Sequence, residues 1–318
     1  MEHPFVTRLR EAELVAPHGR VAAIASTHVR ATGPACTLGD VCEIEERDNE
    51  WSILAQVAAI DTTGITLVPL EYGSSVQLEA RVRVRSGGER VAVGESFAGR
   101  AIDAVGRPLD GKGPIRPERF ARSSGTMLPP LARSTPARLF LTGIRAIDGL
   151  LTLGAGQRIG IFAASGVGKT SLIEQIAAQS ACDHCILCLV GERGREVEGM
   201  WRMLGDQRGA PVTLVAATSD ESPSLRARAV DTALCLAEDW RDQGRDVLLI
   251  LDSATRYAMA LREIGLAAGE PPTVRAYTPG VFAALPRIVE RCGARADGGS
   301  ITAIMTVLSE TDDVDDPI

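Results

Sequence analysis

The stretch that most constrains the fold is an apolar run followed at once by a glycine-rich loop and a helical pattern. Residues 163–170 read AASGVGKT, which follows the phosphate-binding loop pattern G-x-x-x-x-G-K-[ST] with Ala163 at the first position. Gly166 and Gly168 stand where the chain must curl so that its N–H groups converge on phosphate. The next helix directs its amino terminus at the same point. The sequence therefore predicts an α/β domain with a nucleotide site.

This loop defines the predicted binding residues. The basic side chains are arginines except at Lys112 and Lys169, and Lys169 stands where a compact ammonium is required to hold phosphate. The Thr170 hydroxyl is predicted to bind Mg²⁺. The residues expected to contact the nucleotide are Ala163, Ala164, Ser165, Gly166, Val167, Gly168, Lys169, Thr170 and Ser171.

Two acidic residues follow apolar strand patterns. Asp252 ends the run DVLLILD, where a carboxylate is expected to hold the Mg²⁺ water shell. Ser253 follows it, so a catalytic base is not adjacent. Glu192 follows the run CILCLVG and is predicted to polarise the attacking water, with Arg193 stabilising the developing charge. The alternative for Asp252 is a strand-end residue that caps the next helix, and the alternative for Glu192 and Arg193 is a solvated charged loop.

The pattern of apolar residues differs between the two parts of the chain. Between residues 20 and 95, short β-rich runs such as GRVAAI, GITLVPL and ERVAVG are separated by glycine, which predicts a small barrel or sandwich. From about residue 145, strands alternate with helices, which predicts a parallel sheet; residues 222–244 form a long helix capped by Ser222. We expect a β-barrel domain with a short leader at 1–97 and the nucleotide-binding core at 98–318.

Composition excludes several classes of protein. A net charge of -7 argues against a nucleic-acid partner. The first residues carry no secretion signal, and no apolar run is long enough to span a bilayer, so we expect a cytoplasmic protein without a transmembrane segment. Cys182, Cys185 and Cys188, with His184 among them, hint at a metal. Residues three apart in a strand face opposite sides, so we interpret these cysteines as small buried hydrophobes.

Several longer motifs carry a family resemblance. They resemble the type III secretion ATPases and flagellar export ATPases, which are similar to the β subunits of rotary ATP synthases. The motifs, in order, are GRAIDAVGRPLDGKGPI, TGIRAIDGLLTLGAGQRIGIFA, GIFAASGVGKTSL, VGERGREVEGM, the run DSATRYAMALREIGLAAGEPPTVRAYTPGVFAALPRIVERCG and TVLSETDDVDDPI. The resemblance covers the chain from about residue 20 to Ile318. The motif GERGREV is more similar to the export branch than to the synthases.

The resemblance implies a fold and an activity. Members have an N-terminal β-barrel that helps to form a hexameric ring, and a RecA-like core that hydrolyses ATP with Mg²⁺. The family loop reads A-G-S-G-V-G-K-[ST], so only Ala164 departs from it. By this matching Lys169 holds phosphate, Thr170 and Asp252 serve Mg²⁺, and Glu192 is the catalytic carboxylate.

The resemblance also implies partners and a location. Members act at the cytoplasmic face of the inner membrane as homo-oligomers, with stalk and regulator proteins of the secretion apparatus, and they release chaperones from cargo and unfold it. After DDVDDPI the family continues into a helical C-terminal domain, together with an arginine that reaches the neighbouring subunit's nucleotide. We therefore expect a C-terminally truncated member whose core is incomplete at its C-terminal end.

Three alternatives stay open at this point. The flagellar and secretion branches are hard to separate. A truncated chain could be a nucleotide-binding ring component with little turnover. A ring helicase or transcription terminator shares the core but needs aromatic stacking platforms, and aromatic residues make up only 4% of this chain.

Overall fold

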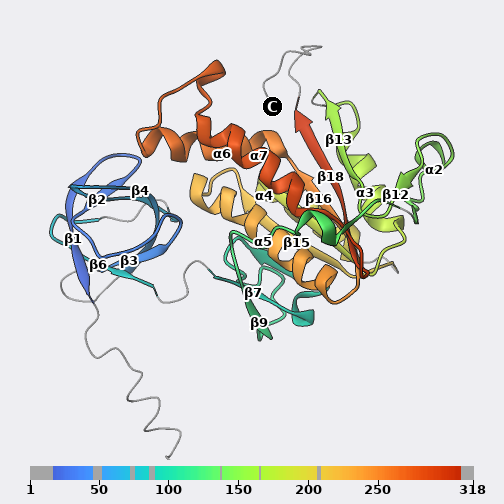
Figure 1. Ribbon diagram of the computed structural model, residues 1–318, viewed down its shortest axis with the longest axis horizontal. Coiled ribbons are helices and arrows are strands. Elements are labelled where there is room, and N and C mark those ends of the chain that lie inside the picture. Colours follow the sequence, from blue (N-terminus) through green and yellow to red (C-terminus); the bar gives the residue numbers. More distant parts are fainter. Residues whose placement is uncertain are drawn as a thin grey trace, which may run out of the picture. The chain divides into compact units, whose positions relative to one another are not determined.

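The computed structural model of the chain describes residues 17–45, 52–71, 76–85, 90–136, 138–164, 166–205 and 209–308. The chain divides into two compact units, Met1–Gly88 and Glu89–Ile318, which are drawn in Figure 1. The predicted boundary after residue 97 stays a prediction. Within the described segments, no helix combines the length and the apolar character that a membrane crossing requires.

The first unit is a closed six-stranded barrel, which confirms the predicted β-barrel. Its strands are β1 (His18–Ile24), β2 (Val29–Ala31), β3 (Val41–Glu45), β4 (Ser52–Asp61), β5 (Gly64–Pro69) and β6 (Arg81–Val84), paired in the order β1-β2-β5-β4-β3-β6. Alternate residues such as Val21, Ile44 and Leu67 face inward and are fully buried. Gly64 has φ 146°, and a Cβ there would overlap the Ala31 carbonyl oxygen, so this hairpin requires glycine.

One run grouped with the barrel belongs elsewhere. Within the run ERVAVG, the described residues Arg90–Val93 form β7, which pairs with β9 (Arg119–Arg122) in the second unit. Its inward side chains Val91 and Val93 pack in the core of that unit. The expectation that this run joins the barrel was wrong, because six strands already close the barrel and leave no free edge.

The second unit is built on one large sheet. Its parallel strands, in spatial order, are β8 (Ala101–Asp103), β15 (Val212–Thr218), β14 (His184–Glu192), β16 (Asp246–Asp252), β18 (Ser300–Leu308) and β13 (Arg158–Ala163). This confirms the predicted parallel sheet. The exception is at one end, where β17 (Gly293–Arg295) pairs antiparallel with β18, and β10 (Arg133–Ser134) pairs antiparallel with β17.

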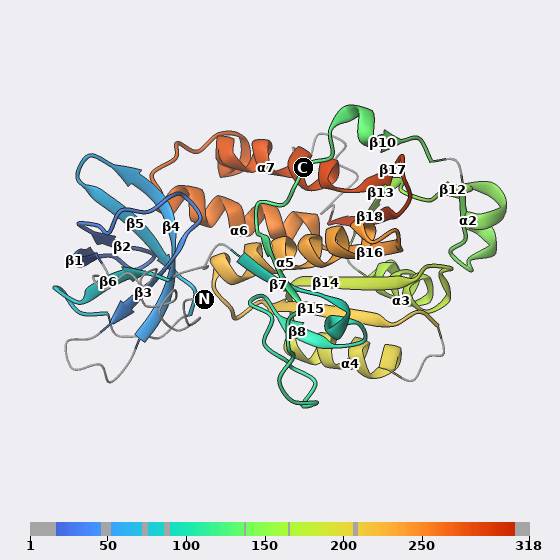
Figure 2. The same cartoon turned by 60° about the horizontal axis from the view of Figure 1, so that its bottom comes forward.

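Helices cover both faces of this sheet (Figure 2). Residues of α5 (Pro223–Asp242), α6 (Ala254–Ala267) and α7 (Pro279–Arg291) pack in one apolar cluster, and residues of α3 (Lys169–Gln179) and α4 (Gly194–Gly205) pack in the other. The predicted cap is present, because the Ser222 hydroxyl accepts from Leu225 N. The smaller elements are η1 (Glu95–Phe97), η2 (Pro130–Ala132), β11 (Leu139–Phe140), α2 (Arg145–Leu150), β12 (Leu153–Gly154) and η3 (Val274–Ala276).

The cysteine run follows the alternation of β14. Cys188 packs in the cluster formed with α5, whereas Cys185 packs in the cluster on the opposite face. Both side chains are fully buried, and Cys182 precedes the strand. These two thiols therefore fill the core on either side of the sheet, as small hydrophobes do.

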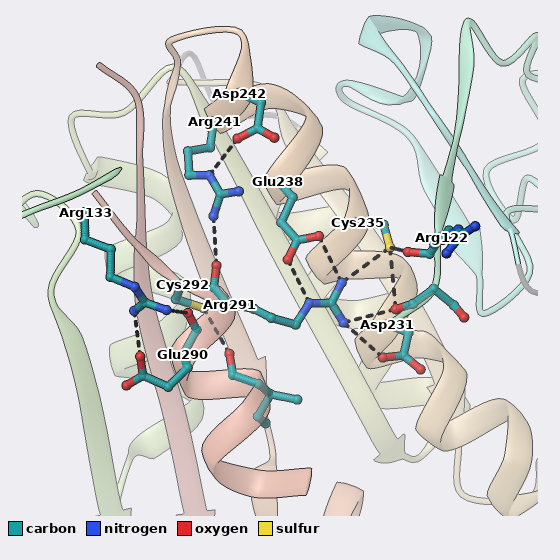
Figure 3. Close-up of polar contacts among 12 residues, drawn as sticks. Arg122, Arg133, Asp231, Cys235, Glu238, Arg241, Asp242, Glu290, Arg291 and Cys292 are labelled. Atoms are coloured by element: carbon teal, nitrogen blue, oxygen red, sulfur yellow. Dashed lines mark hydrogen bonds and ion pairs between the residues drawn. The ribbon is translucent and has the colours of Figure 1, made fainter. Parts of the chain in front are cut away.

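The buried side chain of Arg291 connects several segments of the second unit (Figure 3). The Arg291 guanidinium, on α7, donates to both carboxylate oxygens of Glu238 at 2.7 and 3.1 Å and lies 3.2 Å from Asp231, both on α5. It also donates to the Ser123 carbonyl at 3.1 Å, in the segment after β9. The Arg291 side chain is 4% exposed. One cation therefore joins two helices and the connector that precedes the nucleotide-binding loop.

We expect Glu238→Ala to lower the free energy of unfolding by about 3–5 kcal/mol, because it leaves the buried Arg291 charge without its bidentate partner. Urea denaturation measures the change. The matched control is Glu263→Ala, which removes the partner of Arg226 at a carboxylate that is 42% exposed; this change should cost at most about 1 kcal/mol. Equal costs for the two variants would contradict the role of the buried network.

Candidate nucleotide site

The glycine-rich loop connects β13 to α3. Gly166 has φ 83° and Gly168, the residue before the first helical residue, has φ 96°. A Cβ added to either glycine would meet nothing within 4 Å. The N-cap residue Gly168 has no side chain, and the structure records no side-chain cap on α3 among the described residues. The loop therefore needs glycine for its backbone conformation, and neither glycine is crowded by other atoms, as a loop that binds phosphate next to a helix N-terminus requires.

The two alanines of the loop do not need this conformation. Ala163 is the last residue of β13 and pairs with Leu308 of β18. Among the described residues that are not glycine, positive φ occurs at Glu79, Arg275 and Ala276, and so not at Ala164. The methyl group of Ala164 therefore causes no left-handed strain. Val167, Thr170 and Ser171 are exposed, whereas Ser165 lies outside the described residues.

The structure brings Lys169 and Asp252 together. Lys169 begins α3 and Asp252 ends β16, and β18 lies between their strands in the sheet. The Lys169 Nζ lies 3.0 Å from Asp252 Oδ1. Both side chains are largely buried, at 10% and 4% exposure. The charge that would hold phosphate is therefore already paired with the carboxylate that would serve a metal.

Glu192 ends β14, the strand next to β16, so it reaches the same edge of the sheet as Asp252. It pairs with Arg256 of α6, whose Nε lies 3.3 Å from Glu192 Oε1. Arg256 also donates to the Gly191 carbonyl. The guanidinium therefore fixes both the backbone and the side chain at the end of β14.

The environment of Glu192 adjusts its proton affinity. Burial and a hydrogen bond with Glu196 raise the pKa of Glu192 to about 7, although the Arg256 charge acts in the opposite direction. The same hydrogen bond lowers the pKa of Glu196, so Glu192 is the more basic of the two carboxylates. A carboxyl with a pKa near neutrality is well matched to accept a proton from water at physiological pH.

The structure does not bring Arg193 into this group. Its side chain is 69% exposed, and its ion pair is with Glu196 at 4.0 Å. The predicted catalytic role of Arg193 stays a prediction. Sequence reasoning missed Arg256 and Glu196. The sequence could have indicated both residues, because Arg256 stands four residues after Asp252 and Glu196 stands four residues after Glu192. Residues at this spacing lie close together where the chain is helical.

Comparison with known proteins places this geometry in context. Residues 143–318 match the model of the family described as ATP synthase alpha/beta family, nucleotide-binding domain. The flagellum-specific ATP synthase of Treponema pallidum is 41% identical over an alignment of 319 positions, which covers 99% of this chain and 70% of the relative. The type 3 secretion system ATPase of Xanthomonas euvesicatoria is 43% identical over 95% of this chain and 68% of its own length.

A solved structure is also similar. The structure of the assembled ATPase EscN from the enteropathogenic E. coli type III secretion system matches with a TM-score of 0.87 and 41% sequence identity. The match covers 94% of this chain and 72% of that chain. Fold and sequence therefore indicate the same relatives.

We expect Ala164→Gly to change nucleotide affinity by less than about 1 kcal/mol, because Ala164 has no left-handed backbone to relieve. Titration with a fluorescent ATP analogue measures the affinity. The converse substitution is the control: Gly166→Ala places a Cβ at φ 83° and should weaken binding by about tenfold. An effect of Ala164→Gly beyond tenfold would show that this alanine does strain the loop.

Proposed function

The chain belongs to the ATP synthase alpha/beta family, and from that premise we propose that it powers protein export through a type III secretion apparatus by hydrolysing Mg²⁺-bound ATP. It is an ATP-hydrolysing enzyme, and its relatives are the flagellum-specific ATP synthases and the type III secretion ATPases. The observation that supports the chemistry is the meeting of Lys169, Asp252 and Glu192 at one edge of the sheet.

The loop and Lys169 bind the phosphates. The N–H groups in the first turn of an α-helix point toward its N-terminus, so those at the start of α3 can donate to phosphate oxygens. The Lys169 ammonium exchanges Asp252 Oδ1 for a phosphate oxygen, so its charge stays paired throughout. This exchange releases the Asp252 carboxylate when the nucleotide arrives.

The donor set is suited to Mg²⁺, which prefers oxygen ligands and keeps several waters. Thr170 offers an exposed hydroxyl at the start of α3, and Asp252 offers a carboxylate at the end of β16. A Mg²⁺ ion held there would neutralise charge on the phosphate oxygens. Thr170 and Asp252 are therefore the residues that would hold it.

Glu192 acts on the attacking water. Its carboxylate accepts a proton from that water while Arg256 keeps the side chain oriented along the edge of the sheet. Arg193, at the same turn, is proposed to stabilise charge that develops on the phosphate. Its side chain is exposed and held by a long ion pair with Glu196 at 4.0 Å, so a bound nucleotide can compete for it.

The biological setting is inferred from the relatives. EscN is described as an assembled ATPase and, in a second structure, as a complex with its central stalk EscO. We propose that this chain likewise forms a homo-oligomeric ring, a hexamer, around a stalk protein. We further propose that it acts at the cytoplasmic face of the inner membrane on complexes of chaperone and cargo. Flagellar export is the alternative setting, since relatives of both kinds match equally well.

We expect Glu192→Gln to reduce ATP turnover by about 100-fold or more while nucleotide affinity changes less than about threefold, because only the proton acceptor is lost. Turnover is measured over a range of protein concentrations, so that assembly of subunits is sampled. Glu198→Gln, an isosteric change at an exposed position of α4, should leave turnover unchanged. Tight ATP binding without turnover at any concentration would contradict the enzyme and favour a binding-only ring component.

The value of kcat/KM should rise with pH and reach half its maximum near pH 7, because Glu192 must lose its own proton before it can accept one from water. Glu196→Gln removes a group that raises the pKa of Glu192, so the rise should move to lower pH. Arg256→Ala removes a charge that lowers the pKa, so the rise should move to higher pH. If the pH profiles of the two variants shift in the same direction, or do not shift, Glu192 is not the titrating group.

A further inference from the structure

The Thr306 hydroxyl contacts the Asp252 carboxylate, and Thr306 lies on a strand that carries no predicted site residue. Thr306 lies on β18, opposite Ile161 of the loop-bearing strand β13. The neighbouring residue Met305 lies opposite Leu251 of β16. Thr306 is fully buried. It therefore sits between the strand that presents the phosphate-binding loop and the strand that presents Asp252.

The bond itself is short and charge-assisted. The Thr306 Oγ1 lies 2.5 Å from Asp252 Oδ1 and 3.4 Å from the Leu251 carbonyl oxygen. A hydroxyl has one hydrogen to donate, and the carboxylate is the nearer and more strongly charged acceptor. Thr306 therefore donates to Asp252.

Both protein donors meet on the same carboxylate oxygen. Asp252 Oδ1 accepts from Lys169 and from Thr306. Within the described part of the chain, no hydrogen bond reaches Asp252 Oδ2. The carboxylate is thus held by one oxygen, and the other oxygen is left for a ligand.

We propose that Thr306 is a positioning residue for metal binding: it holds Asp252 Oδ1 so that Oδ2 faces the metal after Lys169 has moved to the phosphate. The inference rests on the proposed Mg²⁺-dependent ATP site. Once Lys169 leaves, Thr306 is the donor that still fixes the orientation of the carboxylate. Without it, Asp252 can rotate, and the metal loses an oriented partner.

The same strand offers a matched control. Thr302 is also buried on β18, four residues before Thr306. Because side chains alternate along a strand, the two threonines lie on the same face of the sheet. Its hydroxyl accepts from Gly156 N at 2.9 Å and does not touch Asp252. Replacement of either threonine by valine removes one buried hydroxyl from the same strand, but only one of these changes releases Asp252.

The experiment measures the affinity of a fluorescent ADP analogue in excess Mg²⁺ and in EDTA, and takes the ratio of the two. Thr306→Val should reduce the tightening by Mg²⁺ about tenfold or more, as loss of a group that supports a metal-bound residue does. Affinity in EDTA should change less than about threefold. Thr306→Ser, which keeps the hydroxyl, should restore the ratio, and Thr302→Val should leave it unchanged. Thr306→Ala is the second variant, with the same expected loss, if the valine variant does not fold.

Two results would overturn the role of Thr306 and leave the nucleotide site standing: a ratio unchanged by Thr306→Val or Thr306→Ala, or an equal loss in Thr302→Val. A different result separates the two proposals. If binding to the unaltered protein is not tightened by Mg²⁺, the proposed metal site itself fails, and the role of Thr306 fails with it.

Discussion

The burial of three central strands on both faces is the constraint on which the rest of the second unit depends. Strands β14, β16 and β18 have nearly every residue buried, because helices cover both sides of the sheet. An ionisable side chain inside such a strand would lose its hydration without a partner, so polar chemistry is displaced to the strand ends. In a parallel sheet the carboxyl ends share one edge, and this is where Glu192 and Asp252 are found.

The buried charges of the second unit are paired in two different ways. The Arg291–Glu238 pair lies away from the nucleotide site, with both partners almost fully buried and joined by two hydrogen bonds. The Lys169–Asp252 pair lies under the open loop, so an incoming phosphate and metal can replace each partner with another of the same sign. Pairs of the first kind hold elements in place, and pairs of the second kind can exchange partners when a ligand binds.

The Glu192–Arg256 pair has an intermediate character. Burial and Glu196 favour the protonated carboxyl, whereas Arg256 favours the charged form, and the balance gives a pKa of about 7. A proton acceptor balanced in this way responds to small changes in its surroundings. Because the Arg256 charge lowers the pKa of Glu192, the position of this guanidinium sets part of the proton affinity of the carboxyl.

The sequence by itself determined the family, the loop, the strand that ends in Asp252 and the helix capped by Ser222, because each depends on a short run of neighbouring residues. Loop glycines, apolar periodicity and a cap act within one or two turns of chain. The tertiary structure alone decided that β7 leaves the barrel, that Arg193 faces solvent while Arg256 holds Glu192, and that Thr306 holds Asp252. The partners in three of these cases lie tens of residues apart in the sequence. In the case of Arg193, the outcome depends on the direction in which the side chain leaves the turn after β14. No local pattern encodes such contacts, and only the packing of the sheet and its helices fixes them.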